Sequence, residues 1–267
     1  MNNIFLNLGP IKIYWYSILI LISIILGLYL GEREAQRNGL GKKFISDISL
    51  KLILFSILGA RIYYVIFNID YYKNNLLDIF KIWQGGLAIY GAVIGAIITI
   101  IIVSKKERVE ILRTTDTMAP YLILGQAIGR WGNFFNHEAY GPSTTLEILK
   151  SLHIPNFVIE GMKINGIYYQ PTFLYESIWC FLGFILLIII RKVYKNQHLG
   201  TLTGIYLIYY PIARFFIEIL RTDSLYIYNI KVSMLVSIIM IIIGIILIIT
   251  SKKRKKYVKS EEVYVNL

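Results

Sequence analysis

Long apolar segments alternate with short polar ones along almost the whole chain. A helix needs ~20 mostly apolar residues to cross a bilayer, and seven segments approach this length. Their bounds are 14–31, 48–68, 86–104, 117–135, 172–191, 202–220 and 230–250. The fourth and sixth segments are the least apolar. The pattern predicts an all-α integral membrane protein with seven transmembrane helices, organised as a single polytopic domain over residues 1–267.

Three connecting regions differ in character from the rest. Residues 136–170 contain few apolar runs and are expected to form a small extracytoplasmic cap. Residues 69–85 are expected to lie along the membrane interface, with Tyr71, Tyr72 and Trp83 at headgroup level, where aromatic side chains are enriched. The last region, 251–267, is a basic tail.

Composition supports a multi-pass membrane protein rather than a soluble domain. Hydrophobic residues make up 56% of the chain and charged residues 16%, and the mean hydropathy is +0.60. The single cysteine, Cys180, sits in an apolar segment, which excludes a disulfide framework and a cysteine metal cluster. The first apolar run lacks a basic leader and continues into a span, so no cleavable signal peptide is expected.

The distribution of lysine and arginine predicts the orientation. Loops 32–47, 105–116 and 192–201 and the tail from residue 251 hold 16 basic residues, whereas the connections on the other side hold 7. Because basic residues concentrate on the cytoplasmic side, we expect the N-terminus outside and the C-terminus in the cytoplasm. Most of the net charge of +12 would then attract anionic lipid at the cytoplasmic face. No recognisable binding module supports nucleic acid as a partner.

Three arginines, Arg61, Arg130 and Arg214, interrupt apolar segments. An arginine in the hydrocarbon region costs at least ~2.5–3.5 kcal/mol, so its presence indicates function by default. Each arginine could instead snorkel to the lipid headgroups. Three such arginines in one chain are better explained by a polar cavity that they line than by three separate cases of snorkelling.

Nine polar residues in or beside the predicted helices fall in the outer half of the membrane. They are Tyr16, Arg61, Tyr90, Arg130, Asn133, Gln170, Glu176, Arg214 and Glu218. A proton relay or ion path would spread such groups through the whole thickness. A one-sided set instead predicts a site open to the outer leaflet or the outer aqueous face.

Helical spacing groups some of these residues. Arg130 and Asn133 are three positions apart and Arg214 and Glu218 four, so each pair shares a helix face. Arg214 and Glu218 could simply neutralise each other's charge within one helix. Glycines recur beside the polar residues, and their spacing permits close helix approach.

Several sequence blocks resemble those of the prolipoprotein diacylglyceryl transferases. The run at 129–141, GRWGNFFNHEAYG, is similar to the signature of that family. Further blocks follow the family order: YWY at 14–16, GAR at 59–61, WQGGLAIYGAVIGA at 83–96, QPTFLYES at 170–177 and RFFIEILRTD at 214–223. The resemblance therefore spans residues ~14 to ~223, which is more specific than any single motif.

This resemblance implies a lipid transfer at the outer face of the bacterial cytoplasmic membrane. The family moves the diacylglyceryl group of phosphatidylglycerol to the thiol of the lipobox cysteine of prolipoproteins, leaving glycerol 1-phosphate, and we expect neither a cofactor nor a metal. By resemblance, the phosphatidylglycerol-binding residues are Arg130, Asn133, Tyr16 and Arg61, and the catalytic residues are Arg214, Glu218, Tyr90 and Glu138. Arginine suits this reaction because its planar fork of donors matches phosphate oxygens.

One position departs from the family pattern. Tyr90 stands where some members have a histidine that is proposed as a base. Tyrosine, with a reference pKa near ~10, is a poor base at neutral pH, so Tyr90 is expected to orient the headgroup or the thiol. His137 is the histidine of interest, because it lies in the signature.

Two other classes of protein compete with the transferase. An outward-facing anion or lipid transporter would also explain buried arginines and close-packed glycines, but no inverted repeat between the halves is visible. A membrane protease would need a nucleophile or metal motif, and neither G-x-S-x-G nor H-E-x-x-H occurs.

Overall fold

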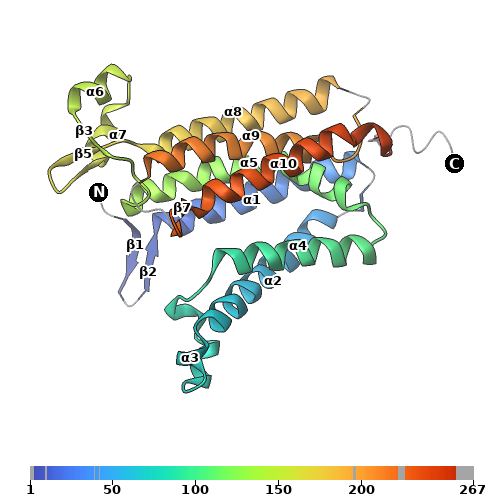
Figure 1. Ribbon diagram of the computed structural model, residues 1–267, viewed down its shortest axis with the longest axis horizontal. Coiled ribbons are helices and arrows are strands. Elements are labelled where there is room, and N and C mark those ends of the chain that lie inside the picture. Colours follow the sequence, from blue (N-terminus) through green and yellow to red (C-terminus); the bar gives the residue numbers. More distant parts are fainter. Residues whose placement is uncertain are drawn as a thin grey trace. The chain divides into compact units, whose positions relative to one another are not determined.

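The computed structural model describes residues 3–9, 11–38, 40–41, 43–194, 197–221 and 226–256 (Figure 1). These residues form two compact units. The first runs as far as Leu30 and resumes at Thr115, and the second comprises Gly31–Thr114.

Helices dominate both units, because a spanning segment must satisfy its backbone hydrogen bonds internally. Among the described residues, six helices are long and apolar enough to cross a membrane. They are α1 (Trp15–Arg37), α2 (Phe44–Phe67), α4 (Ile89–Lys106), α8 (Thr172–Val193), α9 (Thr201–Leu220) and α10 (Val232–Ile249). The prediction of a multi-pass helical membrane protein is thereby confirmed. The predicted span 117–135 lies within a further helix, α5 (Ile111–Asn136), which is less apolar than these six.

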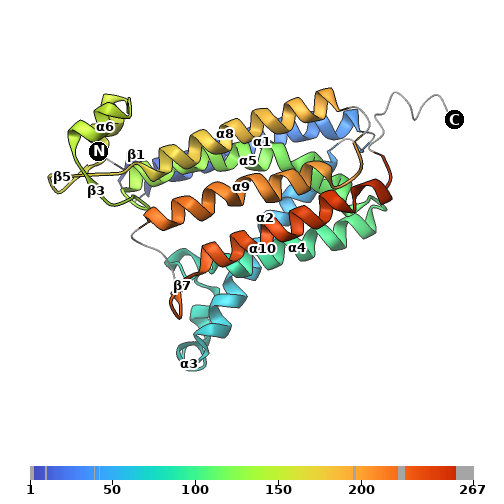
Figure 2. The same ribbon diagram turned by 45° about the horizontal axis from the view of Figure 1, so that its top comes forward.

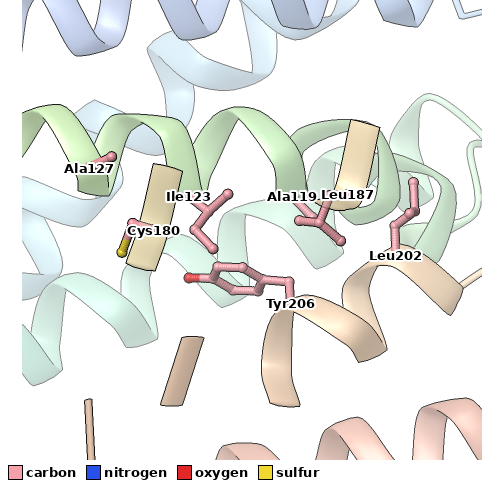
Figure 3. Packing of buried hydrophobic residues seen from close by; sticks show 7 residues of the cluster. All are labelled: Ala119, Ile123, Ala127, Cys180, Leu187, Leu202 and Tyr206. Carbon is pink, nitrogen blue, oxygen red and sulfur yellow. The ribbon is translucent and has the colours of Figure 1, made fainter. Parts of the chain in front are cut away.

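The core of the first unit lies where α5, α8 and α9 meet (Figure 3). Its buried side chains form one cluster: Ala119, Ile123, Ala127, Cys180, Leu187, Leu202 and Tyr206. Cys180 is thus a buried apolar side chain and free of a disulfide. Elsewhere in this unit, α9 and α10 pack closely, since a Cβ at Gly244 would lie 2.8 Å from the carbonyl oxygen of Gly204.

The α1 helix packs along α5 through glycines of α5. A Cβ added at Gly125 or Gly129 would only touch Ser23 or Ile20, at 3.8 Å in each case, whereas a Cβ at Gly132 would overlap the ring of Tyr16. Of these three glycines, only Gly132 is needed for the close approach of α1 to α5.

Short hairpins and a small insertion connect the helices of the first unit. Strands β1 (Ile4–Leu8) and β2 (Ile11–Tyr14) pair antiparallel before α1, and β6 (Tyr226–Ile227) pairs with β7 (Ile230–Lys231) before α10. A short 3-10 turn, η3 (Ser251–Lys253), follows α10. Residues 257–267 of the predicted basic tail lie outside the described part of the chain.

The predicted cap region folds into two short helices and a three-stranded antiparallel sheet. Its elements are β3 (Ser143–Thr144), α6 (Leu146–Ser151), α7 (Asn156–Gly161), β4 (Lys163–Ile164) and β5 (Ile167–Tyr169), with strand order β3-β5-β4. Val158 and Met162 are buried against Phe134 of α5 and Phe173 of α8. This packing attaches the insertion to the ends of α5 and α8 (Figure 2).

The second unit is built on the antiparallel pair α2 and α4. A Cβ at Gly91 would overlap the carbonyl of Gly59, and a Cβ at Gly95 would overlap that of Phe55, so the two backbones approach closely. Between these helices run α3 (Ile69–Tyr72) and the 3-10 helices η1 (Leu76–Phe80) and η2 (Ile82–Gln84).

The connection between α2 and α4 is organised by an acidic side chain. Asp78 accepts hydrogen bonds from Lys81 and Tyr71, which hold the pKa of its carboxyl below the ordinary value. The same contact with Asp78 raises the pKa of the Tyr71 phenol.

Of the aromatic residues predicted at headgroup level, Tyr71 and Trp83 are exposed, whereas Tyr72 is buried.

Candidate functional site

Four charged side chains form one cluster in the first unit: Arg130, Glu176, Arg214 and Glu218. The Oε1 of Glu176 lies 2.9 Å from Nη2 of Arg130, and its Oε2 lies 3.4 Å from Nη1 of Arg214. The Nη2 of Arg214 lies 2.7 Å from Oε2 of Glu218. Glu176 thus pairs with both Arg130 and Arg214, and Arg214 pairs with both Glu176 and Glu218.

The accessible side of the charged cluster is cationic. The two carboxylates are almost fully buried, at 3% side-chain exposure each, while Arg130 and Arg214 are 22% and 16% exposed. Arg221 adds a third guanidinium, with its Nε 3.9 Å from Oε2 of Glu218. The arrangement suits an anion that approaches from the exposed side.

Helix periodicity explains how α9 contributes to this cluster. Tyr210, Arg214 and Glu218 are four residues apart in succession, so all three share one face of α9. The hydroxyl of Tyr210 accepts a hydrogen bond from Arg130 at 3.5 Å and donates one to Glu176 at 3.4 Å. Tyr210 therefore bridges the ion pair that links α5 to α8.

A buried hydrogen-bond chain fixes α5 against α8 next to the charged cluster. The indole nitrogen of Trp131 donates to the hydroxyl of Ser177 at 3.1 Å, and this hydroxyl donates to the carbonyl of Ala127 at 2.8 Å. Trp131 follows Arg130, and Ser177 follows Glu176. The chain therefore holds the two helices in the register that brings Arg130 and Glu176 together.

The signature beyond Arg130 forms a compact polar turn. Arg130 donates to Asn133 at 3.4 Å, and Asn133 in turn donates to Glu138 at 3.0 Å. Asn136 also donates to Glu138, at 3.4 Å. His137 has a left-handed backbone, with φ 52°, at the point where α5 ends. The turn thus connects Glu138 to Arg130 through Asn133.

Tyr16 of α1 packs against α5 just before this turn. Its side chain is partly exposed, and its ring packs directly on Gly132, which stands between Trp131 and Asn133 in the sequence. The structure therefore brings together six of the eight predicted site residues: Tyr16, Arg130, Asn133, Glu138, Arg214 and Glu218.

The other two predicted site residues, Arg61 and Tyr90, belong to the second unit. Arg61 is buried, and its guanidinium donates to four backbone carbonyls of the connection between α2 and α4. These carbonyls belong to Ile79 at 2.8 Å, Gly85 at 2.8 Å, Gly86 at 3.0 Å and Asp78 at 2.5 Å. Tyr90 lies in the first turn of α4, with its ring centroid 6.4 Å from that of Tyr63. Binding of lipid by Arg61 and a catalytic role of Tyr90 both stay predictions.

Sequence reasoning assigned no role to two residues of this site. Glu176 stands out in the sequence as a polar residue of an apolar span, but no motif assigns it a role, although it lies inside the QPTFLYES block. Tyr210 gives only the signal that it precedes Arg214 by one helical turn. Both contact partners on other helices, which spacing along one helix does not reveal.

Comparisons with known proteins agree with the resemblance drawn from the motifs. The model of the family described as prolipoprotein diacylglyceryl transferase matches residues 3–250. The phosphatidylglycerol–prolipoprotein diacylglyceryl transferase of Listeria welshimeri is 48% identical over 249 residues, which cover 93% of this chain and 89% of the relative. The enzyme of the same name from Bacillus cereus strain G9842 is 47% identical over 253 residues, or 95% and 93% of the two chains. The transporter alternative finds no support in these comparisons.

Proposed function

Because the chain belongs to the prolipoprotein diacylglyceryl transferase family, we propose that the charged cluster of its first unit is the site of the transfer. The chain is an enzyme and a multi-pass protein of the bacterial membrane, and it transfers diacylglyceryl from phosphatidylglycerol to prolipoproteins. The residues that carry this reaction, and the lipobox cysteine as the acceptor, are our proposal.

The observation that carries this proposal is that two partly exposed arginines, Arg130 and Arg214, pair with one buried carboxylate, that of Glu176. In the reaction the thiolate of the acceptor cysteine forms a bond to a glyceryl carbon, and the bond from that carbon to the phosphate oxygen breaks. Negative charge then develops on the departing glycerol 1-phosphate. Guanidinium donors that are already fixed in place stabilise such charge in a low-dielectric site far more than in water. Glu176 fixes both Arg130 and Arg214 in this way.

The remaining residues take supporting roles in this proposal. Asn133 and Tyr16 lie beside Arg130 and complete the headgroup site, and Glu138 holds Asn133. Glu218 holds Arg214. Within the second unit, Arg61 fixes the connection between α2 and α4.

We also propose that α5 is a seventh span. With 26 residues, it is about 39 Å long, which exceeds the hydrocarbon thickness of ~30 Å. Buried Ala119, Ile123 and Ala127 pack it against α8 and α9. A helix enclosed by other helices contacts little lipid, so it can span without being strongly apolar.

Seven spans put the termini on opposite sides of the membrane. Together with the basic asymmetry, this supports an orientation with the N-terminus, the charged cluster and the cap outside. A reporter active only in the cytoplasm should work when fused after Leu267 and fail when inserted at 140–165 of the cap. The reverse result would overturn the proposed orientation.

Transfer itself is tested with the purified protein in vesicles that contain labelled phosphatidylglycerol. Adding a lipoprotein signal peptide with its cysteine should release glycerol phosphate and lipidate the peptide. The same peptide with serine in place of the cysteine is the matched control and should give neither product. Transfer that Arg130→Ala and Arg214→Ala leave intact would show that the charged cluster is not the site.

A further inference from the structure

Lys231 connects the end of α9 to the start of α10. It is the last residue of β7, and α10 begins at the next residue. Its Nζ donates to three backbone carbonyls at the end of α9. The acceptors are Glu218 at 2.6 Å, Arg221 at 3.0 Å and Ile219 at 3.4 Å.

The charge of Lys231 suits the end of α9 and not the start of α10. The last carbonyls of a helix lack partners within the helix, and a cation there is favourable, whereas a cation at a helix N-terminus is not. Lys231 occupies the N-cap position of α10 and makes no side-chain cap there, where serine, threonine, asparagine or aspartate is preferred. Its role therefore lies at α9.

The end of α9 is the part that carries the charged cluster. The shortest hydrogen bond of Lys231 goes to the carbonyl of Glu218, and the carboxylate of the same Glu218 lies 2.7 Å from Arg214. Lys231 thus fixes the backbone of Glu218, and the side chain of Glu218 pairs with Arg214.

We propose that Lys231 is a positioning residue for diacylglyceryl transfer. It fixes the last turn of α9 so that Glu218 keeps Arg214 in place. This inference rests on the proposed function of the charged cluster. A direct bond to the lipid phosphate is a poorer account of Lys231, because an ammonium has three donors and three carbonyls accept from it.

The test compares Lys231→Met and Lys231→Arg with the wild-type protein in the vesicle assay. Misplacing a catalytic group by ~1 Å can cost ~10²-fold, so Lys231→Met should lower kcat between about tenfold and 10²-fold while leaving KM for phosphatidylglycerol nearly unchanged. Lys231→Arg should recover most of the rate, because arginine also offers several cationic donors. The Nζ of Lys231 lies 5.9 Å from the ring centroid of Tyr226. The matched control is therefore Lys163→Met in the cap, an exposed lysine whose Nζ lies 5.4 Å from the ring centroid of Tyr168. It should behave as wild type.

A double-mutant cycle separates positioning from a general loss of structure. If Lys231 acts through Glu218, Lys231→Met should cost little in a Glu218→Gln background, because residues that act as a unit are non-additive. Additive losses, or a KM that rises while kcat holds, would overturn the inference. A wild-type rate in Lys231→Met, alongside transfer abolished by Arg214→Ala, would overturn it too, and the proposed function would then still stand. Absence of transfer by the wild-type protein would instead refute the proposed function.

Discussion

The carboxylate of Glu176 pairs with Arg130 across two helices, with 2.9 Å between Oε1 and Nη2. Its second oxygen contacts Arg214 at 3.4 Å, and only 3% of the side chain is exposed. Glu176 therefore links three helices of the first unit, α5, α8 and α9, at the charged cluster. This geometry makes Glu176 a structural residue of the proposed site.

Glu176→Gln should lower both thermal stability and transfer. Glutamine keeps the shape of the side chain but leaves two guanidiniums without their shared counter-charge, and removing one partner of a buried ion pair costs ~3–5 kcal/mol. This figure is an upper bound, because both arginines retain some contact with solvent. The measurements are the melting temperature in detergent and the initial transfer rate. Glu160→Gln, at an exposed residue of the cap, is the control, and equal behaviour of the two variants would contradict the prediction.

Arg130→Lys should impair transfer nearly as severely as Arg130→Ala. The guanidinium reaches Glu176, Tyr210 and Asn133 through its two terminal nitrogens, and a single ammonium cannot reproduce this fork toward a phosphodiester. Removing one donor from a site that stabilises developing negative charge costs ~10²–10³-fold in rate. Near wild-type transfer by Arg130→Lys, at normal membrane insertion, would mean that charge alone suffices.

Gly132→Ala should reduce activity by displacing Tyr16. The added Cβ would overlap the Tyr16 ring, and overpacking of this kind costs ~1–3 kcal/mol. Gly125→Ala is the matched control on the same helix, because its Cβ would meet only Ser23, at 3.8 Å. The two variants are compared by phosphatidylglycerol binding and transfer rate. A Gly132→Ala protein as active as Gly125→Ala would remove Tyr16 from the headgroup site.

Hydropathy was enough to predict the long helices but not all of their ends. Each of the seven predicted spans overlaps a helix, yet α1 continues to Arg37, past the predicted end at residue 31. Five of the six residues from Glu32 to Arg37 are polar, so a hydropathy pattern ends before the hydrogen-bonded helix does. The β1–β2 hairpin was not anticipated, because its short strands adjoin an apolar run and have no distinct pattern of their own.

The residues of the site likewise fall into two groups: those that local sequence signals identify and those that only the packing of helices reveals. Motifs and helical spacing identified Arg130, Arg214 and Glu218, because these signals are local in the chain. The role of Glu176 depends on which faces of α5, α8 and α9 meet, and that follows from packing at residues such as Trp131 and Ser177. Pairing between helices is not encoded in any single segment.

Arg61→Lys should loosen the connection between α2 and α4. Arg61 donates to four carbonyls of residues 78–86, whereas a lysine has at most three donors and lacks the planar fork. The measurement is the rate of proteolysis within residues 69–88, compared with Lys51→Arg on the same helix as a control. If proteolysis were unchanged while phosphatidylglycerol binding fell, Arg61 would be a lipid ligand and not a support for the connection.

Tyr90→Phe should retain most of the activity. A phenol is rarely an anion at neutral pH, so we expect Tyr90 to orient a substrate and not to remove the thiol proton. General acid–base assistance is typically worth ~10²–10⁴-fold, and Tyr90→Phe should lose less than the lower end of that range. Tyr90→His should also remain active, since imidazole can accept a proton in a similar space.

The measurement for Tyr90 is the initial transfer rate to a cysteine-containing peptide across pH, at matched protein levels. Tyr63→Phe is the control, because it removes a hydroxyl from the neighbouring ring of the same unit. If Tyr90→Phe abolished transfer at every pH but left phosphatidylglycerol binding intact, the phenol would have to take part in the chemistry. A positional role predicts instead a modest loss with an unchanged pH profile, because no titrating group of the reaction has been removed.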